Sequence, residues 1–119
     1  MSNVRTHRDL NVWKESMNLV KQVYSLTQSF PKEEIYGLVS QMRRAAVSIP
    51  SNIAEGSARS PSTDFARFLY VAMGSLAELE TQLLLSRELG FTQNIEMDEN
   101  IDQIKRMLIG LIKSLRKRG

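Results

Sequence analysis

The stretch QMRRAAVSIPSNIAEGSAR, residues 41–59, joins a helical apolar rhythm to a residue that helix interiors avoid. Its apolar side chains recur every three or four residues and so share one face of a helix with about 3.6 residues per turn: Met42, Ala46, Ile49 and Ile53. Pro50 lies in the middle of this face, where it leaves the carbonyl of Ala46 without its usual N–H partner and crowds the preceding turn, at a cost of about 3 kcal/mol. We therefore predict a helix that is kinked or broken near Ile49.

Outward from this stretch, the apolar periodicity predicts four helices and no strand. They are expected at about residues 11–29, 34–56, 61–89 and 98–116, after a flexible arm at residues 1–9. The connections are short, so consecutive helices should run antiparallel. A chain of 119 residues supports one hydrophobic core. We predict a single domain over residues 1–119 of the all-α class, an antiparallel up-and-down four-helix bundle.

Particular residue types mark the expected helix ends. Asp9 or Asn11 can cap the first helix, because short polar side chains accept hydrogen bonds from the free N–H groups of a first turn. Ser60 and Pro61 are expected to start the third helix. A glycine followed by a hydrophobic residue predicts a Schellman ending at Gly90.

Two further glycines interrupt apolar segments. Gly56 is expected to cap the C-terminus of the second helix. Gly74 lies inside the third helix, where glycine costs about 1 kcal/mol relative to alanine. We therefore expect Gly74 to mark a close approach of another backbone.

The first and third helices each carry two adjacent apolar stripes. In the first helix one stripe contains Trp13, Met17, Val20 and Tyr24, and the other contains Val12, Leu19, Val23 and Leu26. A helix in a small bundle buries only about three-sevenths of its positions in the core, so the surplus predicts contact with another subunit. The candidate interface residues are Val12, Leu19, Val23, Leu26, Tyr70, Met73 and Ala77.

Composition narrows the class of protein. The net charge is +3 and the isoelectric point is near 9.4, a mild basic excess that allows an acidic partner such as nucleic acid. The absence of cysteine rules out disulfides and thiolate metal sites and suits a cytoplasmic protein. No apolar run approaches the length of about 18 residues that a membrane span needs, so no membrane association is expected.

The sequence offers little for catalysis. The single histidine, His7, lies in the expected arm, and there is no Glu-x-x-His pair and no Gly-rich phosphate loop. Glu55, Glu78 and Glu80 are the carboxylates nearest to candidate status, and we interpret them as ion-pair partners, with Arg67 or Arg44 as the expected partner of Glu78. We predict that the protein is not an enzyme and has no catalytic residue, metal ligand or cofactor.

Basic residues are the strongest functional signal. From residue 105 to residue 118 there are six basic side chains and no acidic one, a pattern that favours contact with phosphates but also suits a solvated helix end. Arg43 and Arg44 are adjacent and point about 100° apart, so at most one should face a given partner. The candidate nucleic-acid-binding residues are Arg43, Arg44, Arg59, Arg67, Lys105, Arg106, Lys113, Arg116, Lys117 and Arg118.

The stretch at residues 41–59 resembles the signature segment of a family of small bacterial four-helix-bundle proteins found in intervening sequences of 23S ribosomal RNA genes. The resemblance continues through residues 10–24, 30–41 and 64–83, whereas residues 101–115 resemble the last helix of the family by apolar rhythm only. It implies a homopentameric ring with a positively charged surface. The chain is also similar to the accessory proteins of diversity-generating retroelements, which bind RNA and a reverse transcriptase, and this similarity implies the same partners.

Two functions follow as hypotheses. The first is a non-enzymatic, homo-oligomeric bundle that binds RNA or DNA through a basic surface as an accessory or scaffold. The alternative is a protein-interaction adaptor with no nucleic-acid role. Salt dependence separates them, because binding through phosphates weakens steeply as salt rises.

Overall fold

Apolar residues at helical spacing organise the chain into four long α-helices. The computed structural model describes residues 7–59 and 62–118, and no strand occurs in these two ranges. The predicted all-helical fold with four helices is therefore confirmed. The helices are α1 (Asn11–Thr27), α2 (Leu38–Ser57), α3 (Ser62–Glu88) and α4 (Glu96–Arg118).

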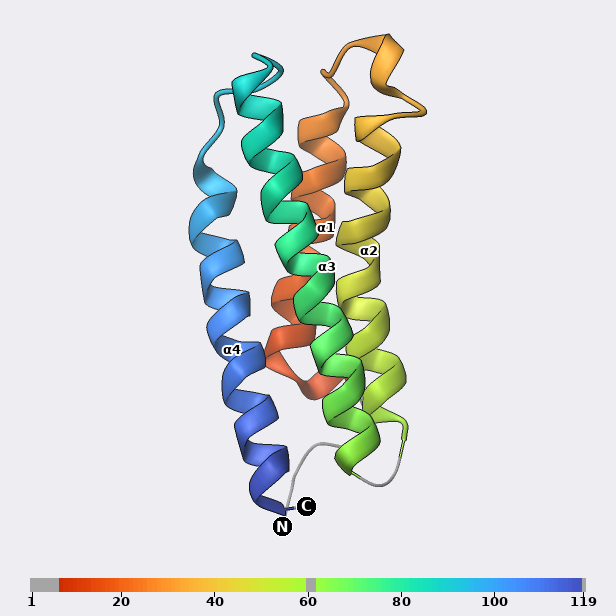
Figure 1. The fold of residues 1–119 in the computed structure, drawn as a ribbon, viewed down its shortest axis with the longest axis vertical. Helices are drawn as coiled ribbons and strands as arrows, with labels where there is room; N and C mark the ends of the chain where they lie inside the picture. Colours follow the sequence, from red (N-terminus) through yellow and green to blue (C-terminus); the bar gives the residue numbers. More distant parts are fainter. Residues whose placement is uncertain (1–6, 60–61, 119) are drawn as a thin grey trace.

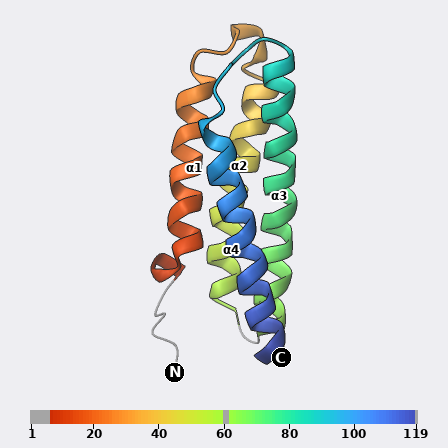
Figure 2. The ribbon, with the colours of Figure 1, turned by 90° about the vertical axis from the view of Figure 1, so that its left-hand side faces the viewer.

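Each long helix lies beside two others. Within the described residues α1 packs against α2 and α4, and α3 packs against α2 and α4, so α1 and α3 are diagonal to each other. Figure 1 shows consecutive helices running in alternating directions along a long axis of 48 Å. Figure 2, turned by 90°, shows α1 and α3 on opposite sides of α4.

The face predicted from residues 41–59 lies in the core. Met42, Ala46, Ile49 and Ile53 are each 0% exposed. α2 continues through Pro50 without interruption, so the break expected near Ile49 is wrong, and the kink stays a prediction. Full burial of each isoleucine contributes about 1.5–3 kcal/mol, enough to offset the cost of about 3 kcal/mol for an internal proline.

Gly56 does not end α2 but permits close packing against α3. A Cβ at Gly56 would lie 2.7 Å from Cβ of Phe68 and 3.0 Å from Cδ1 of Phe65. A cap at Gly56 was therefore the wrong prediction, since α2 continues to Ser57. Within the single chain Gly74 marks no close approach, because a Cβ there would meet no described atom within 4 Å.

The helix starts differ from those predicted. The N-cap of α1 is Leu10, without a side-chain capping bond, so neither Asp9 nor Asn11 is the cap. α2 starts later than expected, after a 3-10 helix (η2, Lys32–Glu34), and Oε1 of Glu34 accepts a hydrogen bond from the N–H of Leu38 at 3.2 Å. The expected start of α3 at Ser60 and Pro61 lies outside the described residues.

The end of α3 is the predicted Schellman motif. The N–H of Phe91 donates to the carbonyl of Ser86 at 2.9 Å, and the N–H of Gly90 donates to the carbonyl of Arg87 at 3.0 Å. Gly90 has a φ of 79°, which an L-residue with a Cβ seldom adopts. The Phe91 ring packs against Phe30, with 5.5 Å between centroids.

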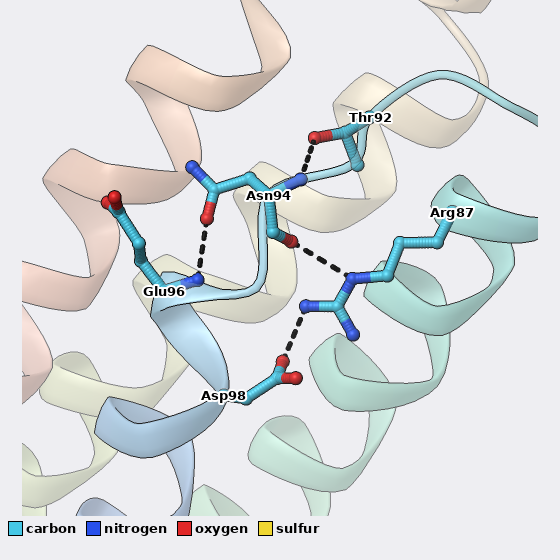
Figure 3. Close-up of polar contacts among 5 residues, drawn as sticks. All are labelled: Arg87, Thr92, Asn94, Glu96 and Asp98. Atoms are coloured by element: carbon cyan, nitrogen blue, oxygen red, sulfur yellow. Dashed lines mark hydrogen bonds and ion pairs between the residues drawn. The ribbon is translucent and has the colours of Figure 1, made fainter.

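A polar network then fixes the turn from α3 into α4 (Figure 3). Nε of Arg87 donates to the carbonyl of Asn94 at 3.0 Å, and the same guanidinium pairs with Asp98 on α4. The side-chain oxygen of Asn94 accepts from the N–H of Glu96 at 2.7 Å, which satisfies one of the free donors at the start of α4.

Three residues of the expected N-terminal arm lie against the bundle. Residues 7–9 form a 3-10 helix (η1, His7–Asp9) that contacts α1 and α2. The His7 ring meets the edge of Trp13, with 5.1 Å between centroids. The flexibility of the arm stays a prediction, and residues 1–6 lie outside the described part of the chain.

α3 is unusually apolar for its burial. Among the described helices it is the one long and apolar enough to cross a membrane by length and composition, with a mean hydropathy of 1.2 over 18 residues, of which 33% are buried. The sequence expectation that no segment meets such a criterion therefore needs correction. Two thirds of this apolar window is only partly buried or is exposed in the single bundle.

Candidate nucleic-acid interface

Many of the predicted basic residues gather where α2 ends, α3 begins and α4 ends, at the lower end of the bundle in Figure 1. The start of α3 and the end of α4 lie side by side there. Residues 115 and 116 of α4 line a hollow of about 390 Å³ together with residues 62, 63, 66 and 70 of α3. We call this cluster the basic end and define it by Arg59, Arg67, Lys113, Arg116 and Lys117.

Two arginines of the basic end flank an aromatic ring near the start of α3. The guanidinium carbons of Arg59 and Arg67 lie 5.0 and 5.9 Å from the centroid of the Phe68 ring. Arg59 pairs with Glu55 at 3.4 Å, and Arg67 pairs with Asp64 at 3.5 Å. Exposed pairs of this kind contribute about 0–1 kcal/mol, so either guanidinium can exchange its carboxylate for a phosphate at little cost.

The α4 side of the basic end is largely unneutralised. Lys113 and Lys117 are exposed and pair with no acidic residue in the part of the chain that the structure describes. Nη1 of Arg116 reaches the hydroxyl of Tyr70 at 3.4 Å, a neutral partner. The side chain of Arg118, also predicted for this site, lies outside the described residues.

The other two α4 candidates are engaged elsewhere. Lys105 pairs with Glu80 of α3 at 3.4 Å, and Arg106 pairs with Asp102 of its own helix at 2.9 Å. The structure therefore does not bring them together with the basic end. Glu80 and Glu55 are ion-pair partners, as predicted. Glu78 instead accepts a hydrogen bond from Gln82 at 3.2 Å, and within the described single chain it pairs with neither Arg67 nor Arg44.

Arg43 and Arg44 lie toward the opposite end of the bundle. Nε of Arg43 donates to Oγ1 of Thr27 at 3.0 Å, and its guanidinium carbon lies 4.4 Å from the centroid of the Tyr24 ring. These contacts join the last turn of α1 to α2. Arg44 is exposed, and both arginines line the same hollow of about 840 Å³. That at most one of them faces a given partner stays a prediction.

A second hollow, of about 290 Å³, continues along α1 and α2, and both hollows share Val47. Met17 and Tyr24 of α1 are 36% and 41% exposed, and Val47 is 40% exposed. We call the two hollows together the α1–α2 groove. Its apolar wall includes Trp13, Met17, Val20, Tyr24, Val47 and Pro50.

The predicted interface residues of α1 need correction. Val12, Leu19 and Val23 are at most 5% exposed in the single chain, and Leu26 is partly buried against the same core. The stripe that faces outward is instead the one in the α1–α2 groove. Periodicity identifies two apolar stripes but not which one the other helices cover, so sequence reasoning chose the wrong one.

The α3 candidates are mixed. Met73 packs against the core, whereas Tyr70 is 51% exposed and Ala77 is also exposed. They belong to a wider exposed surface that we call the outer face of α3. It consists of Tyr70, Val71, Gly74, Ala77, Leu84, Leu85 and Leu89.

Sequence reasoning missed the contact between Thr27, Tyr24 and Arg43, because nothing in a hydroxyl at residue 27 signals a partner 16 positions away. Among the described residues, no group of three or more His, Asp or Glu side chains could hold a metal ion.

Comparison with known families gives a match over residues 8–110, to the family of 23S rRNA-intervening sequence proteins. The chain belongs to this family. The match spans α1, α2, α3 and most of α4, but the last basic residues of α4 lie beyond it. A search of curated proteins finds no match.

Proposed function

We propose that this member of the family is a non-enzymatic, homo-oligomeric protein that binds RNA or DNA through its basic end, as an accessory or scaffold. One observation carries the proposal: basic side chains from α3, from α4 and from Arg59, which follows α2, gather at one end of the bundle. Lys113, Arg116 and Lys117 pair there with no acidic residue among those described.

The chemistry of this end suits phosphates more than bases. Lysine and arginine neutralise backbone phosphates and release condensed counterions, which gives affinity without sequence preference. In a homo-oligomer the end would recur in every subunit, so several weak contacts would act together. By resemblance the oligomer is a pentamer in a bacterial cytoplasm.

Nucleic-acid binding is tested on the whole protein. Fluorescence anisotropy with an RNA, a single-stranded DNA and a duplex DNA of two unrelated sequences should show affinity that falls by about 10³-fold or more between 50 and 200 mM salt. Sequence preference should be small. No detectable binding at low salt would reject the nucleic-acid role.

The exposed apolar surfaces support self-association. Met17, Val47, Tyr70, Val71 and Leu84 are between 36% and 51% exposed, and a monomeric protein rarely leaves so many large apolar side chains in contiguous patches. Light scattering at micromolar concentration should therefore give a multiple of the 13.6 kDa chain mass. A monomer mass would reject the oligomer.

The α1–α2 groove favours one alternative, a protein-interaction adaptor without a nucleic-acid role. Its apolar wall and the three basic residues that line it, Lys32, Arg43 and Arg44, suit an acidic protein partner. By resemblance, a reverse transcriptase is a candidate partner. A reverse-transcriptase gene beside this one would support that role. A position within an insertion in a 23S ribosomal RNA gene would instead support a role like that of the intervening-sequence proteins.

A further inference from the structure

We propose that the α1–α2 groove of one subunit receives the outer face of α3 from a second copy of this chain, joined head to tail. The inference rests on the proposed homo-oligomer and specifies its contact. The two surfaces differ in shape, chemistry and position, which determines the kind of assembly they can build.

The groove supplies an apolar wall with basic residues at one end. Met17, Tyr24 and Val47 are more than a third exposed although they border a hollow between two packed helices. Its upper part is also lined by Lys32, Arg43 and Arg44, and none of the side chains that line the groove is acidic. An occupant should therefore be an apolar helix with carboxylates.

The outer face of α3 has these properties. Tyr70, Val71, Leu84, Leu85 and Leu89 are 46–54% exposed, and small residues lie between them at Gly74 and Ala77. A Cβ at Gly74 would meet no described atom within 4 Å, so this part of the helix is open to the backbone of a neighbour. The acidic residues beside this surface are Glu78 and Glu88, both exposed.

The two surfaces lie at matching heights along the bundle. Ser48 of α2 hydrogen bonds to Ser75 of α3 at 2.8 Å, which sets the two residues level. One turn further toward the end opposite the basic end, α2 carries Arg44 and α3 carries Glu78. A neighbour placed beside the groove in the same orientation therefore brings its Glu78 to the level of Arg44.

Position determines the symmetry. α3 lies diagonally across the bundle from α1, so its outer face points away from the groove. One subunit can thus bind a neighbour through its groove and another through its α3. Such a heterologous contact repeats from subunit to subunit and closes into a ring where the rotation permits.

Two single variants test the contact. Val47→Glu places a charge in the groove and Ala77→Glu places one on the outer face of α3, and both sites are exposed, so each fold should survive. Each variant alone should be monomeric by light scattering, whereas Ile95→Glu, at a 68% exposed residue outside both surfaces, should assemble like the parent.

Mixing the two variants identifies the head-to-tail arrangement. Each retains one intact surface, so an equimolar mixture should form a one-to-one dimer and nothing larger. A mixture that stays monomeric would overturn the head-to-tail contact. Full assembly of both single variants would also overturn the head-to-tail contact, while leaving the homo-oligomer intact. A monomeric parent would instead reject the oligomer itself.

A membrane is the other possible occupant of the α3 surface. If the parent does not self-associate but binds anionic lipid vesicles, and Ala77→Glu abolishes that binding, the α3 surface is assigned to a membrane.

A charge exchange tests the register. Arg44→Glu should raise the concentration for half-dissociation by tenfold or more, and adding Glu78→Arg in the same chain should reverse most of that loss. If Glu78→Arg fails to restore assembly, the proposed pairing of Arg44 with Glu78 of the neighbouring subunit is overturned.

Discussion

At the scale of single residues, Gly56 occupies a point where α2 and α3 approach each other closely. A Cβ there would lie 2.7 Å from Cβ of Phe68, a distance that real structures essentially never contain. The Phe68 Cβ is fixed to the α3 backbone, so the clash can be relieved only by separating the two helices.

We expect Gly56→Ala to lower the free energy of unfolding by about 1–3 kcal/mol, because overpacking strains a close-packed contact. Gly110→Ala is the matched control: Gly110 lies in α4 with no described atom within 4 Å of an added Cβ. That change should raise stability by up to about 1 kcal/mol through helix propensity. Urea denaturation gives the free energy of unfolding of both variants. An equal change in the two would contradict the close approach of α2 and α3 at Gly56.

Arg43 contributes geometry as well as charge. Its guanidinium donates to Thr27 and lies over the Tyr24 ring at 4.4 Å. Arg43→Lys keeps the charge but loses the planar fork, so the free energy of unfolding should fall by about 1–2 kcal/mol. Arg44→Lys, at an exposed neighbour, should change it by less than about 0.5 kcal/mol. Thermal denaturation measures both variants. If both lower the free energy of unfolding by a similar amount, the contact of Arg43 with Thr27 and Tyr24 does not stabilise the fold.

At the scale of elements, Pro50 is both a helix residue and part of the α1–α2 groove. It lies inside α2 and lines the groove with Met17 and Val20. We propose that α2 bends at Pro50 and that the bend shapes this groove for a neighbour. The proline then persists because of assembly, since folding alone would favour a residue that donates a hydrogen bond to Ala46.

Pro50→Ala should therefore raise or leave unchanged the stability of the single bundle while weakening self-association, measured by denaturation and by light scattering over a dilution series. A variant that is simply more stable, with the parent's assembly and nucleic-acid affinity, would contradict a role for the bend.

The helices themselves follow from the sequence, but their ends and faces follow only in part. The Schellman ending at Gly90 depends on adjacent residues, and local pattern predicts it correctly. The later start of α2 depends on η2 and on Glu34 reaching the N–H of Leu38, which propensity does not reveal. The roles of Gly56 and Gly74 depend on distant packing: Gly56 lies inside α2 against α3 and does not cap it, and no backbone of the same chain approaches Gly74.

At the scale of the whole molecule, the predicted basic residues form more than one group. Sequence position alone put Lys105 and Arg106 together with Lys113 and Lys117, because all four lie on α4. Tertiary contacts separate them, since Lys105 faces Glu80 of α3 and Arg106 pairs within its own helix. Ion pairing between helices is the information that a one-dimensional charge pattern lacks.

This separation predicts unequal effects on nucleic-acid binding. The double change Lys113→Gln and Lys117→Gln should lower the slope of log affinity against log salt by about one to two, because fewer counterions are released. The double change Lys105→Gln and Arg106→Gln removes the same charge from the same helix but from paired positions. It should alter the slope much less, and an equal reduction would place the site elsewhere.

The lengthwise order of charge on α4 has a consequence for how the protein meets a partner. Acidic residues open the helix at Glu96, Asp98 and Glu99, and basic residues close it at Lys113, Arg116 and Lys117, within a molecule 48 Å long. Such a bundle carries an electric dipole moment along its axis. In the field of a polyanion it experiences a torque that turns the positive pole forward before any contact forms, which raises the fraction of productive collisions. In this orientation the α3–α4 turn lies at the end away from the nucleic acid, where a second macromolecule could approach it.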